Sequence, residues 1–565
     1  MRKGILLTTF RILASLLSGA LLVLAFPDYD VSWLVWIALV PLMLAILGTT
    51  PKQGFFFCFV FSAVLFSGVC RWIFEVSRYT LLHHLLLNLI LGVPLSVFGW
   101  AFAFISSRRG PTLALSTAPF IWVSLEYLRS NLSFLSLPWA LLAHSQYQTL
   151  SVIQISSVTG AYGVSFLIVL VNATLAGLIY PFISKSEEAA ATLVAPESER
   201  LKPPLPSENN PPSSPFSKGG SINLLPFLKG GWEGLKRGKY LIIITTSLLF
   251  FTLVYGYFTV TNTITGKKIK ISLVQGNIEQ AKKWDRSYRN YIIERYEELS
   301  REASRDQPRL VIWPEAATPG FVLSDFALKK RITELVREMN AYFLIGSSEY
   351  PKFQKTRSRV SGSGNTALFL SPDGKVLGQY LKIHLVPFAE TVPYQKLIPW
   401  PRFIVPEGMK VFEVPGNEIT LFDLEGTKFG VLICWESIFP GLFRSFVKEG
   451  AHFMVNITNE GWFNKPTIFY QYVAMNVFRA VENRVSLVRC ANTGVSCIID
   501  PHGNILNKVK DEKGREIFVP GVLTVSVIAA DSRTIYTRCG DWFAFLSVGC
   551  SITCLILALF RRSRG

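Results

Sequence analysis

Three side chains capable of acyl-transfer chemistry follow apolar segments at widely separated positions. Glu315 ends the run Leu-Val-Ile-Trp-Pro-Glu, and Cys434 ends the run Gly-Val-Leu-Ile-Cys. Lys382 begins a loop that contains proline and phenylalanine and closes at Glu390. Open sheets usually place ligand sites at the ends of buried strands. The sequence therefore predicts that Glu315, Lys382 and Cys434 form one catalytic site.

These residue types meet the demands of acyl transfer through cysteine. The nucleophile is a thiolate, and a free thiol with a pKa of about 8.5 is only partly ionised at neutral pH. Glu315 can take the thiol proton as a general base, and the Lys382 ammonium can stabilise the oxyanion of the tetrahedral intermediate. Each residue alone also has a structural alternative, as a core thiol, a loop carboxylate or a solvated charge. The ordered set favours catalysis.

The elements that must position these groups lie between residues 268 and 533, where the composition is that of an ordinary globular domain. Apolar runs of strand length alternate with helical stretches, which is typical of an α/β layered core. The predicted strands are 270–274, 309–313, 342–346, 366–370, 428–433, 452–457 and 485–489. The predicted helices are 289–305, 327–340 and 469–483.

The rest of the chain is apolar enough to be a membrane domain. Of the 565 residues, 50% are hydrophobic and 17% are charged, and the mean hydropathy is +0.34. Charge-poor runs of about 20 residues, the length that crosses a bilayer, predict about eight transmembrane helices. Six lie within residues 1–183, at 9–26, 32–49, 54–75, 82–106, 111–128 and 151–183, and two more lie at 240–261 and 543–560.

Basic residues mark alternate ends of successive spans, and such ends are usually cytoplasmic. They are Arg2, Lys3, Lys52, Arg108, Arg109, Arg561, Arg562 and Arg564. Both chain ends and the segment 184–239 then lie in the cytoplasm, whereas the domain at 268–533 lies on the outer face. The segment 184–239 is a low-complexity sequence rich in proline, serine and asparagine, which predicts a linker.

The charge and the cysteine pattern exclude other classes. The formal net charge of +18 agrees with the positive-inside bias and with attraction to anionic lipid headgroups. Basic residues are scattered over the domain at 268–533 and form no basic stripe with aromatics, so no nucleic-acid partner is expected. The eight cysteines show neither a disulfide framework nor metal-ligand spacing, and the six histidines include no His-Glu-x-x-His array. The sequence predicts no metal site.

The three motifs, in this order, resemble those of the nitrilase superfamily, whose members use a Glu–Lys–Cys triad on an α-β-β-α sandwich. The matching segments are Trp-Pro-Glu315, Lys382 before His-Leu-Val-Pro-Phe, and Cys434-Trp-Glu. Other segments resemble a membrane-bound branch, the apolipoprotein N-acyltransferases. They begin at Val274 (Val-Gln-Gly-Asn), Lys283 (Lys-Trp-Asp), Asn456 (Asn-Ile-Thr-Asn-Glu-Gly-Trp-Phe), Arg479 (Arg-Ala-Val-Glu), Arg489 (Arg-Cys-Ala-Asn-Thr-Gly) and Tyr536 (Tyr-Thr-Arg-Cys-Gly-Asp). In the membrane half, Glu126-Tyr-Leu-Arg129 and Leu137-Pro-Trp139 resemble the periplasmic loop of that branch.

The resemblance implies an acyltransferase of the bacterial cytoplasmic (inner) membrane, with its catalytic domain on the periplasmic face. Cys434 would take a fatty acyl chain from a membrane phospholipid as a thioester and pass it to the α-amine of the N-terminal S-diacylglyceryl-cysteine of a lipoprotein. We expect a monomer that needs no cofactor. Supporting roles, in holding Lys382 and Cys434 or in gating the lipid, are implied for Glu390, Trp435, Glu436 and Trp284.

Two alternatives stay open from the sequence. A membrane-tethered amidase or nitrilase would keep the triad but would give no reason for eight spans. A non-enzymatic scaffold or transporter with an inactive outer domain is disfavoured by the complete triad and by the scarcity of charges within the spans. Three departures from the family pattern leave the substrate preference open. They are Glu460 where Asp is usual, Ala389 where Gly is usual, and Tyr472 where His is usual.

Overall fold

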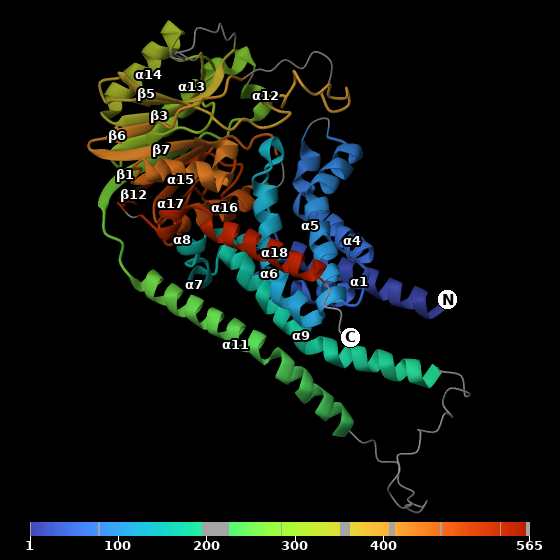
Figure 1. Ribbon diagram of the computed structural model, residues 1–565. Coiled ribbons are helices and arrows are strands. Elements are labelled where there is room, and N and C mark those ends of the chain that lie inside the picture. Colours follow the sequence, from blue (N-terminus) through green and yellow to red (C-terminus); the bar gives the residue numbers. More distant parts are fainter. Residues whose placement is uncertain are drawn as a thin grey trace, which may run out of the picture.

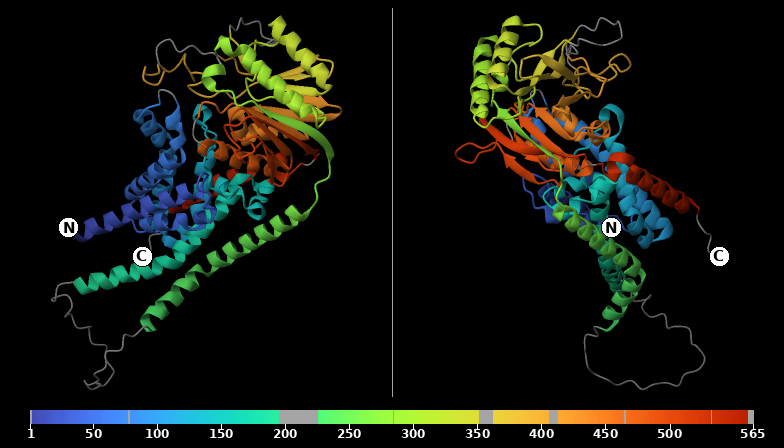
Figure 2. Two further views of the ribbon diagram at one scale, coloured as in Figure 1. Left: turned by 180° about the vertical axis from the view of Figure 1, so that it is seen from behind. Right: turned by 90° about the vertical axis from the view of Figure 1, so that its left-hand side faces the viewer.

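The computed structural model describes residues 2–76, 79–194, 225–283, 285–350, 362–405, 413–463, 466–531 and 533–560. They form a bundle of helices and a layered α/β domain stacked on it (Figure 1). The long helix α11 (Leu225–Thr261) runs along one side of the bundle and leads into the first strand of the α/β domain (Figures 1 and 2). The first and the last described helices, α1 (Arg2–Ala25) and α18 (Trp542–Leu559), both belong to the bundle (Figure 1).

Among the described residues, six helices are long and apolar enough to cross a membrane. Thr50 and Gln53 form a capping box at the start of one of them, where Pro51 occupies the first turn without losing a hydrogen bond. The six segments are Gly4–Ala25 of α1 (Arg2–Ala25), α4 (Pro51–Val69), α5 (Leu81–Arg109), Ala161–Ile183 of α9 (Ala161–Val194), Lys239–Thr261 of α11, and α18 (Trp542–Leu559).

Two of the predicted spans differ from this set. The segment 32–49 is broken into η1 (Ser32–Leu34), α2 (Val35–Ala38) and α3 (Val40–Ile46), and the break precedes Pro41, whose ring disrupts a continuous helix. The segment 111–128 is a continuous helix, α6 (Pro111–Ser130), but buried Glu126 and Arg129 make it more polar than the six. Eight spans therefore stay a prediction.

The predicted linker and the span before it also have different boundaries. Helix α9 runs on to Val194 and α11 begins at Leu225, so both edges of the segment 184–239 are helical. Residues 195–224 of this segment lie outside the described residues. The predicted span at 151–183 begins with the short helices α7 (Leu150–Ile153) and α8 (Ser156–Thr159), and α9 starts after Gly160, whose φ is +68°.

Two six-stranded sheets make up the α/β domain. In each sheet three neighbouring strands are parallel and their flanking strands are antiparallel. The first sheet has the order β12 (Gly521–Ala529), β1 (Lys267–Gln275), β2 (Leu310–Ile312), β3 (Tyr342–Glu349), β4 (Gly364–Leu370), β5 (Val376–Leu381). The second has the order β11 (Ile505–Lys508), β10 (Cys497–Ile499), β9 (Ser486–Ala491), β8 (Phe453–Thr458), β7 (Thr427–Ile433), β6 (Leu421–Leu424).

The sheets pack against each other and carry helices on their outer faces. Between them, the ring of Phe369 on β4 lies 5.3 Å from the rings of Phe422 on β6 and Phe429 on β7. Figure 1 shows α13 (Arg289–Ser304) and α14 (Phe326–Met339) over the first sheet, and α15 (Pro440–Lys448) and α16 (Thr467–Asn483) on the side of the second. The predicted α/β sandwich is confirmed.

The remaining described elements are short helical segments. They are η2 (Arg71–Glu75), η3 (Ser133–Leu135), η4 (Leu142–Gln146), α12 (Gln280–Lys283), η5 (Arg286–Tyr288), η6 (Cys434–Ile438) and α17 (Ile535–Cys539). The seven predicted strands correspond to β1–β4 and β7–β9, and the three predicted helices correspond to α13, α14 and α16. The strands β5, β6, β10, β11 and β12 were not predicted.

Candidate active site

The three candidate residues follow three different strands. Glu315 comes shortly after β2, Lys382 directly follows β5, and Cys434 directly follows β7. The strands β2 and β5 belong to one sheet, whereas β7 belongs to the facing sheet. Both sheets therefore contribute to the site.

Glu315 and Lys382 meet in a buried ionic contact. The Nζ atom of Lys382 lies 3.5 Å from Oε1 of Glu315 and 2.6 Å from Oε1 of Glu390. The side chain of Lys382 is 0% exposed and that of Glu315 is 7% exposed. A buried ammonium needs such partners because its transfer out of water costs several kcal/mol. The structure thus joins the predicted carboxylate and ammonium.

Cys434 lies within electrostatic range of both groups. Burial raises the pKa of its thiol well above the usual range, the carboxylate of Glu315 raises it further, and the ammonium of Lys382 lowers it. The resting site therefore holds a protonated thiol at neutral pH. A thiol of this kind becomes a nucleophile when a neighbouring base accepts its proton. All three predicted residues are brought together.

Three donors hold Glu315 in place. Nδ2 of Asn365 donates to Oε1 over 2.6 Å, and the backbone N–H of Asn459 donates to Oε2 over 2.6 Å. The ammonium of Lys283 donates to the main-chain oxygen of Glu315 over 2.9 Å. Asn365 was not predicted as a site residue, because it precedes the predicted strand 366–370 and no local motif marks it. Lys283 appeared only inside a family motif.

The backbone at Cys434 has an uncommon conformation. Its φ angle is +53°, in the left-handed region that costs a non-glycine residue roughly 1–2 kcal/mol. Asn456 supports this sharp turn, because its Nδ2 donates to the main-chain oxygens of Leu432 and Cys434 over 3.1 and 3.3 Å. The turn directs the chain from β7 into η6 and presents the thiol at the end of the sheet.

Glu436 connects the turn at Cys434 with the loop that begins at Lys382. Its carboxylate accepts hydrogen bonds from the backbone N–H groups of Ile433, Ile383 and His384 over 2.7, 2.7 and 3.0 Å, and from the Tyr380 hydroxyl over 2.8 Å. Burial raises the pKa of Glu436 to about 7, and the backbone donors oppose that rise. This predicted supporting residue therefore acts between the two sheets.

The other predicted supporting residues have different positions. Glu390 bonds Lys382 with one oxygen and accepts the backbone N–H of Val386 with the other over 2.8 Å. Trp435 is half-buried, with its ring 5.5 Å from that of Phe439. Trp284 lies outside the described residues.

A further carboxylate, Glu413, was missed by sequence reasoning. Burial raises its pKa to about 8, and the neighbouring Glu390 raises it as well. Its Oε2 atom is buried without a hydrogen-bond partner among the described residues, as suits a neutral acid. The same described part of the chain contains no cluster of three or more His, Cys, Asp or Glu side chains able to hold a metal.

Comparisons with known proteins agree with this geometry. Residues 18–174 match the apolipoprotein N-acyltransferase N-terminal domain, and residues 270–533 match the carbon-nitrogen hydrolase domain. An apolipoprotein N-acyltransferase from Geobacter metallireducens is 35% identical over 558 residues, which are 98% of this chain and 96% of that protein. The chain belongs to the apolipoprotein N-acyltransferase family.

The comparisons also found more distant similarities. An apolipoprotein N-acyltransferase from Chlorobaculum tepidum is 28% identical, with 97% of this chain and 96% of that protein covered. A solved amidase from Nesterenkonia sp. AN1 is 18% identical, covers 46% of this chain and 94% of its own, and has a TM-score of 0.34. The two family matches and the full-length relatives show that the chain is an apolipoprotein N-acyltransferase with a multi-pass membrane domain, which implies an acyl donor and a lipoprotein substrate.

Within this acyltransferase, the charged motif of α6 supports the proline–tryptophan loop. Arg129 donates to the main-chain oxygens of Leu137 and Trp139 over 3.2 and 2.7 Å. Glu126 accepts from the indole N–H of Trp122 and from the backbone N–H of Leu142 over 3.0 and 2.9 Å. The two charges therefore fix the conformation that presents Trp139 to the catalytic domain.

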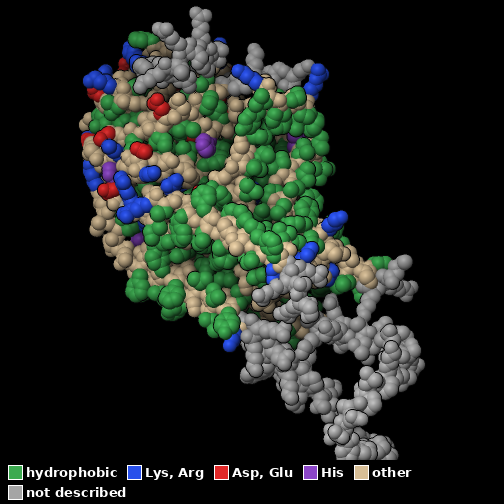
Figure 3. Space-filling model, viewed as in Figure 1, with side chains coloured by type: hydrophobic (Ala, Val, Ile, Leu, Met, Phe, Trp, Pro, Cys, Tyr) green, Lys and Arg blue, Asp and Glu red, His purple; other side chains and the backbone are tan. Residues whose placement is uncertain are grey.

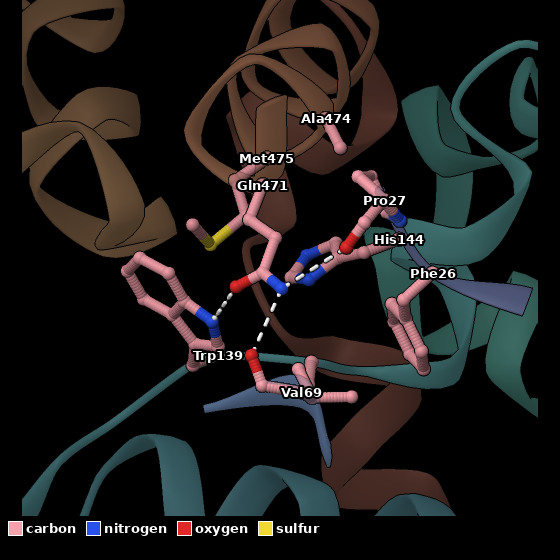
Figure 4. Close-up of a pocket in the computed structure, with 9 residues that line it drawn as sticks. Phe26, Pro27, Val69, Trp139, His144, Gln471, Ala474 and Met475 are labelled. Atoms are coloured by element: carbon pink, nitrogen blue, oxygen red, sulfur yellow. Dashed lines mark hydrogen bonds between the residues drawn. The ribbon is translucent and has the colours of Figure 1, made fainter. Parts of the chain in front are cut away.

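Gln471 of α16 bonds the catalytic domain to the bundle (Figure 4). Its Oε1 accepts the indole N–H groups of Trp72 and Trp139 over 3.1 and 2.7 Å. Its Nε2 donates to the main-chain oxygens of Pro27 and Val69 over 3.2 and 3.0 Å. One amide thus uses two acceptor and two donor positions to bind three separate segments of the membrane domain.

The departures at Glu460 and Tyr472 occupy one buried cluster. Glu460 is bonded by the guanidinium of Arg489, which also bonds Asn456 below the Cys434 turn. The same guanidinium lies 5.2 Å from the ring centroid of Tyr472, and that ring also contacts Trp139, with 5.0 Å between their centroids. The longer Glu460 side chain fits because Gly494 leaves space for its carboxylate.

Proposed function

We propose that this acyltransferase forms a thioester on Cys434 and uses Glu315 and Lys382 to make and consume it. The sulfur bonds the acyl carbon of a membrane phospholipid while Glu315 accepts the thiol proton. Lys382 stabilises the oxyanion, the ester C–O bond breaks, and Glu315 returns the proton to the leaving lysophospholipid. The observation that carries this proposal is the buried Glu315–Lys382 contact beside Cys434.

The second half-reaction delivers the acyl chain to the α-amine of an N-terminal S-diacylglyceryl-cysteine. The amine nitrogen bonds the acyl carbon, the C–S bond breaks, and the amine proton passes through Glu315 to the sulfur. The product is an amide, and the thiol is restored. Because Glu315 is the base in both half-reactions, a monomer can complete the whole cycle.

The surface supports a setting in which lipid substrates are met within the bilayer. Figure 3 shows hydrophobic side chains over the helix bundle and most charged ones over the α/β domain. Side chains on α11 are strongly exposed although apolar, for example Phe250 at 63% and Phe251 at 65%. Lipid is the environment in which such a surface is stable. Each buried CH₂ contributes about 0.8 kcal/mol, so acyl donors and lipidated acceptors stay in the membrane.

The loop that follows Lys382 touches the bundle. The ring nitrogen Nε2 of His83 on α5 lies 2.8 Å from the main-chain oxygen of Phe403, and the hydroxyls of Ser133 and Tyr394 lie 2.8 Å apart. Leu397 in this loop is 79% exposed. We infer that lipid substrates enter the site on the side where this loop meets the bundle. We further propose that the chain crosses a bacterial cytoplasmic membrane eight times, with the catalytic domain on the periplasmic face.

The thioester is the decisive observable. Purified protein is incubated with phospholipid micelles and its mass is measured: the wild type gains an acyl chain that hydroxylamine removes, and Cys434→Ala gains none. Cys539→Ala, which removes an exposed thiol, is the control and is expected to behave as the wild type. Triacylated lipoprotein formed by Cys434→Ala would overturn the mechanism. Ammonia released from small amides without acyl capture would instead indicate an amidase.

A further inference from the structure

Lys283 is a second buried ammonium beside the triad. It ends α12, and its side chain belongs to a residue only 7% exposed. Its Nζ donates to the main-chain oxygen of Glu315 over 2.9 Å. Among the residues that the structure describes, no carboxylate lies within ion-pair distance of it, in contrast to Lys382 with Glu315 and Glu390. An ammonium buried in this way is costly unless nearby negative charge compensates for it.

The segment that carries Lys283 is bonded to the same loop that holds Glu315. Asn492 accepts the backbone N–H of Ile278 over 2.9 Å and donates to its main-chain oxygen over 2.8 Å. The Nδ2 atom of Asn459 donates to Gln280 of α12 over 2.9 Å, and the backbone N–H of Asn459 donates to the Glu315 carboxylate. The position of Lys283 is therefore fixed relative to Glu315 by several bonds.

The balance of charge at the site gives this ammonium a role. Lys382 bonds both Glu315 and Glu390, so these three groups together carry one net negative charge. Glu413 adds none at pH 7, because burial and Glu390 raise its pKa to about 8. Lys283 supplies the missing positive charge. The carboxylate of Glu315 acts on it in the resting site, and the Cys434 sulfur does so when it is ionised.

We propose, on the basis of the function proposed above, that Lys283 is a positioning residue of the catalytic centre whose ammonium balances the negative charge that moves from Glu315 to the Cys434 sulfur and the acyl oxygen. That charge stays within the site throughout both half-reactions. Lys382 stabilises it while already sharing its own charge with Glu390. Lys283 is held beside this charge by its bond to the main-chain oxygen of Glu315, whereas Lys382 contacts the Glu315 carboxylate.

The test compares neighbouring lysines of one short helix. Lys283→Met removes the buried charge, whereas Lys282→Met removes a half-buried lysine that pairs with Glu279. Full-length proteins are mixed with phosphatidylethanolamine micelles, and the rate of thioester formation on Cys434 is measured by mass spectrometry. We expect Lys283→Met to be slower by at least about tenfold, Lys282→Met to be unchanged, and Lys283→Arg to recover most of the rate.

A pH profile separates this role from a structural one. Burial lowers the pKa of Lys283 to about 8, so in the wild type the rate should fall as pH rises through that value. Lys283→Arg keeps its charge and should show a smaller decline; what remains is the titration of Glu413, whose pKa is also about 8. Equal rates for Lys283→Met and the wild type, or equal declines in the wild type and Lys283→Arg, would overturn the inference. If the wild type itself forms no thioester, the proposed function fails instead. The comparison of the wild type with Lys283→Arg decides the inference even if Lys283→Met does not fold.

Discussion

Replacing Gln471 by leucine tests whether one amide fixes the catalytic domain on the membrane domain. Gln471, Trp72 and Trp139 are 4%, 8% and 2% exposed, so water does not replace the lost bonds. Two indole N–H groups lose their acceptor, and each unsatisfied buried donor costs about 1–3 kcal/mol. The Gln471→Leu variant should therefore lose about 2–6 kcal/mol of unfolding free energy. Thermal unfolding in detergent and hydrogen exchange along α16 measure the loss.

Two further variants make this experiment specific. Gln148→Leu changes an exposed glutamine of the same region that donates one hydrogen bond to the Tyr147 hydroxyl, and it should cost no more than about 1 kcal/mol. Gln471→Glu keeps acceptors for both indoles but turns a carboxylate oxygen toward the carbonyls of Pro27 and Val69, so it should also be destabilised. If Gln471→Leu unfolds and exchanges like the wild type, or no more easily than Gln148→Leu, the argument that this amide joins the two domains is refuted.

Two other predictions concern the buried acids of the catalytic domain. Gly494→Ala would place a methyl group against the Glu460 carboxylate and force that carboxylate away from Arg489, which should cost about 1–3 kcal/mol of unfolding free energy, measured by thermal unfolding. The control is Gly441→Ala, because a Cβ atom added there meets no atom within 4 Å. Equal stability of the two variants would contradict the prediction. Burial and Glu390 raise the pKa of Glu413 from 4.5 to about 8, so the folded protein retains a proton that the unfolded chain releases. Stability then falls as pH rises from about 4.5 to 8, and Glu413→Gln should show a shallower decline; identical slopes would contradict this.

The sequence predicted the positions of Glu315 and Cys434 because both follow central parallel strands. Every residue of β2 is buried, and β7 is buried over its last five residues, so both strands appear as uninterrupted apolar runs. The strand before Lys382 is different. β5 lies at a sheet edge and is mostly exposed or half-buried, and its pattern has no such run. Lys382 was found through its local motif and not through a predicted strand.

Other features depend on contacts between distant parts of the chain. Asn365 bonds Glu315 across 50 residues and Asn459 does so across 144, and no local pattern carries such information. The same limit applies to the membrane domain. Residues 32–49 are apolar enough to suggest a span, but their short helices are mostly buried in the bundle and are interrupted before Pro41. Apolar composition records exclusion from water and does not distinguish lipid from protein.

The arrangement of bonds explains how a thiol can be used in so enclosed a site. Burial keeps Cys434 protonated, so the proposed reaction depends on a base and on positive charge that are in place before substrate arrives. Glu315 accepts hydrogen bonds from one residue each of α12, β4 and the loop after β8. Lys382 is bonded by Glu390, and Glu436 bonds the Lys382 loop to the Cys434 turn. Each element is thus fixed by a partner from another part of the fold. Because α16 is bonded through Gln471 to the bundle, the same network fixes the position of the catalytic domain relative to the membrane domain, as the function proposed above requires if a lipid ester is to reach the sulfur.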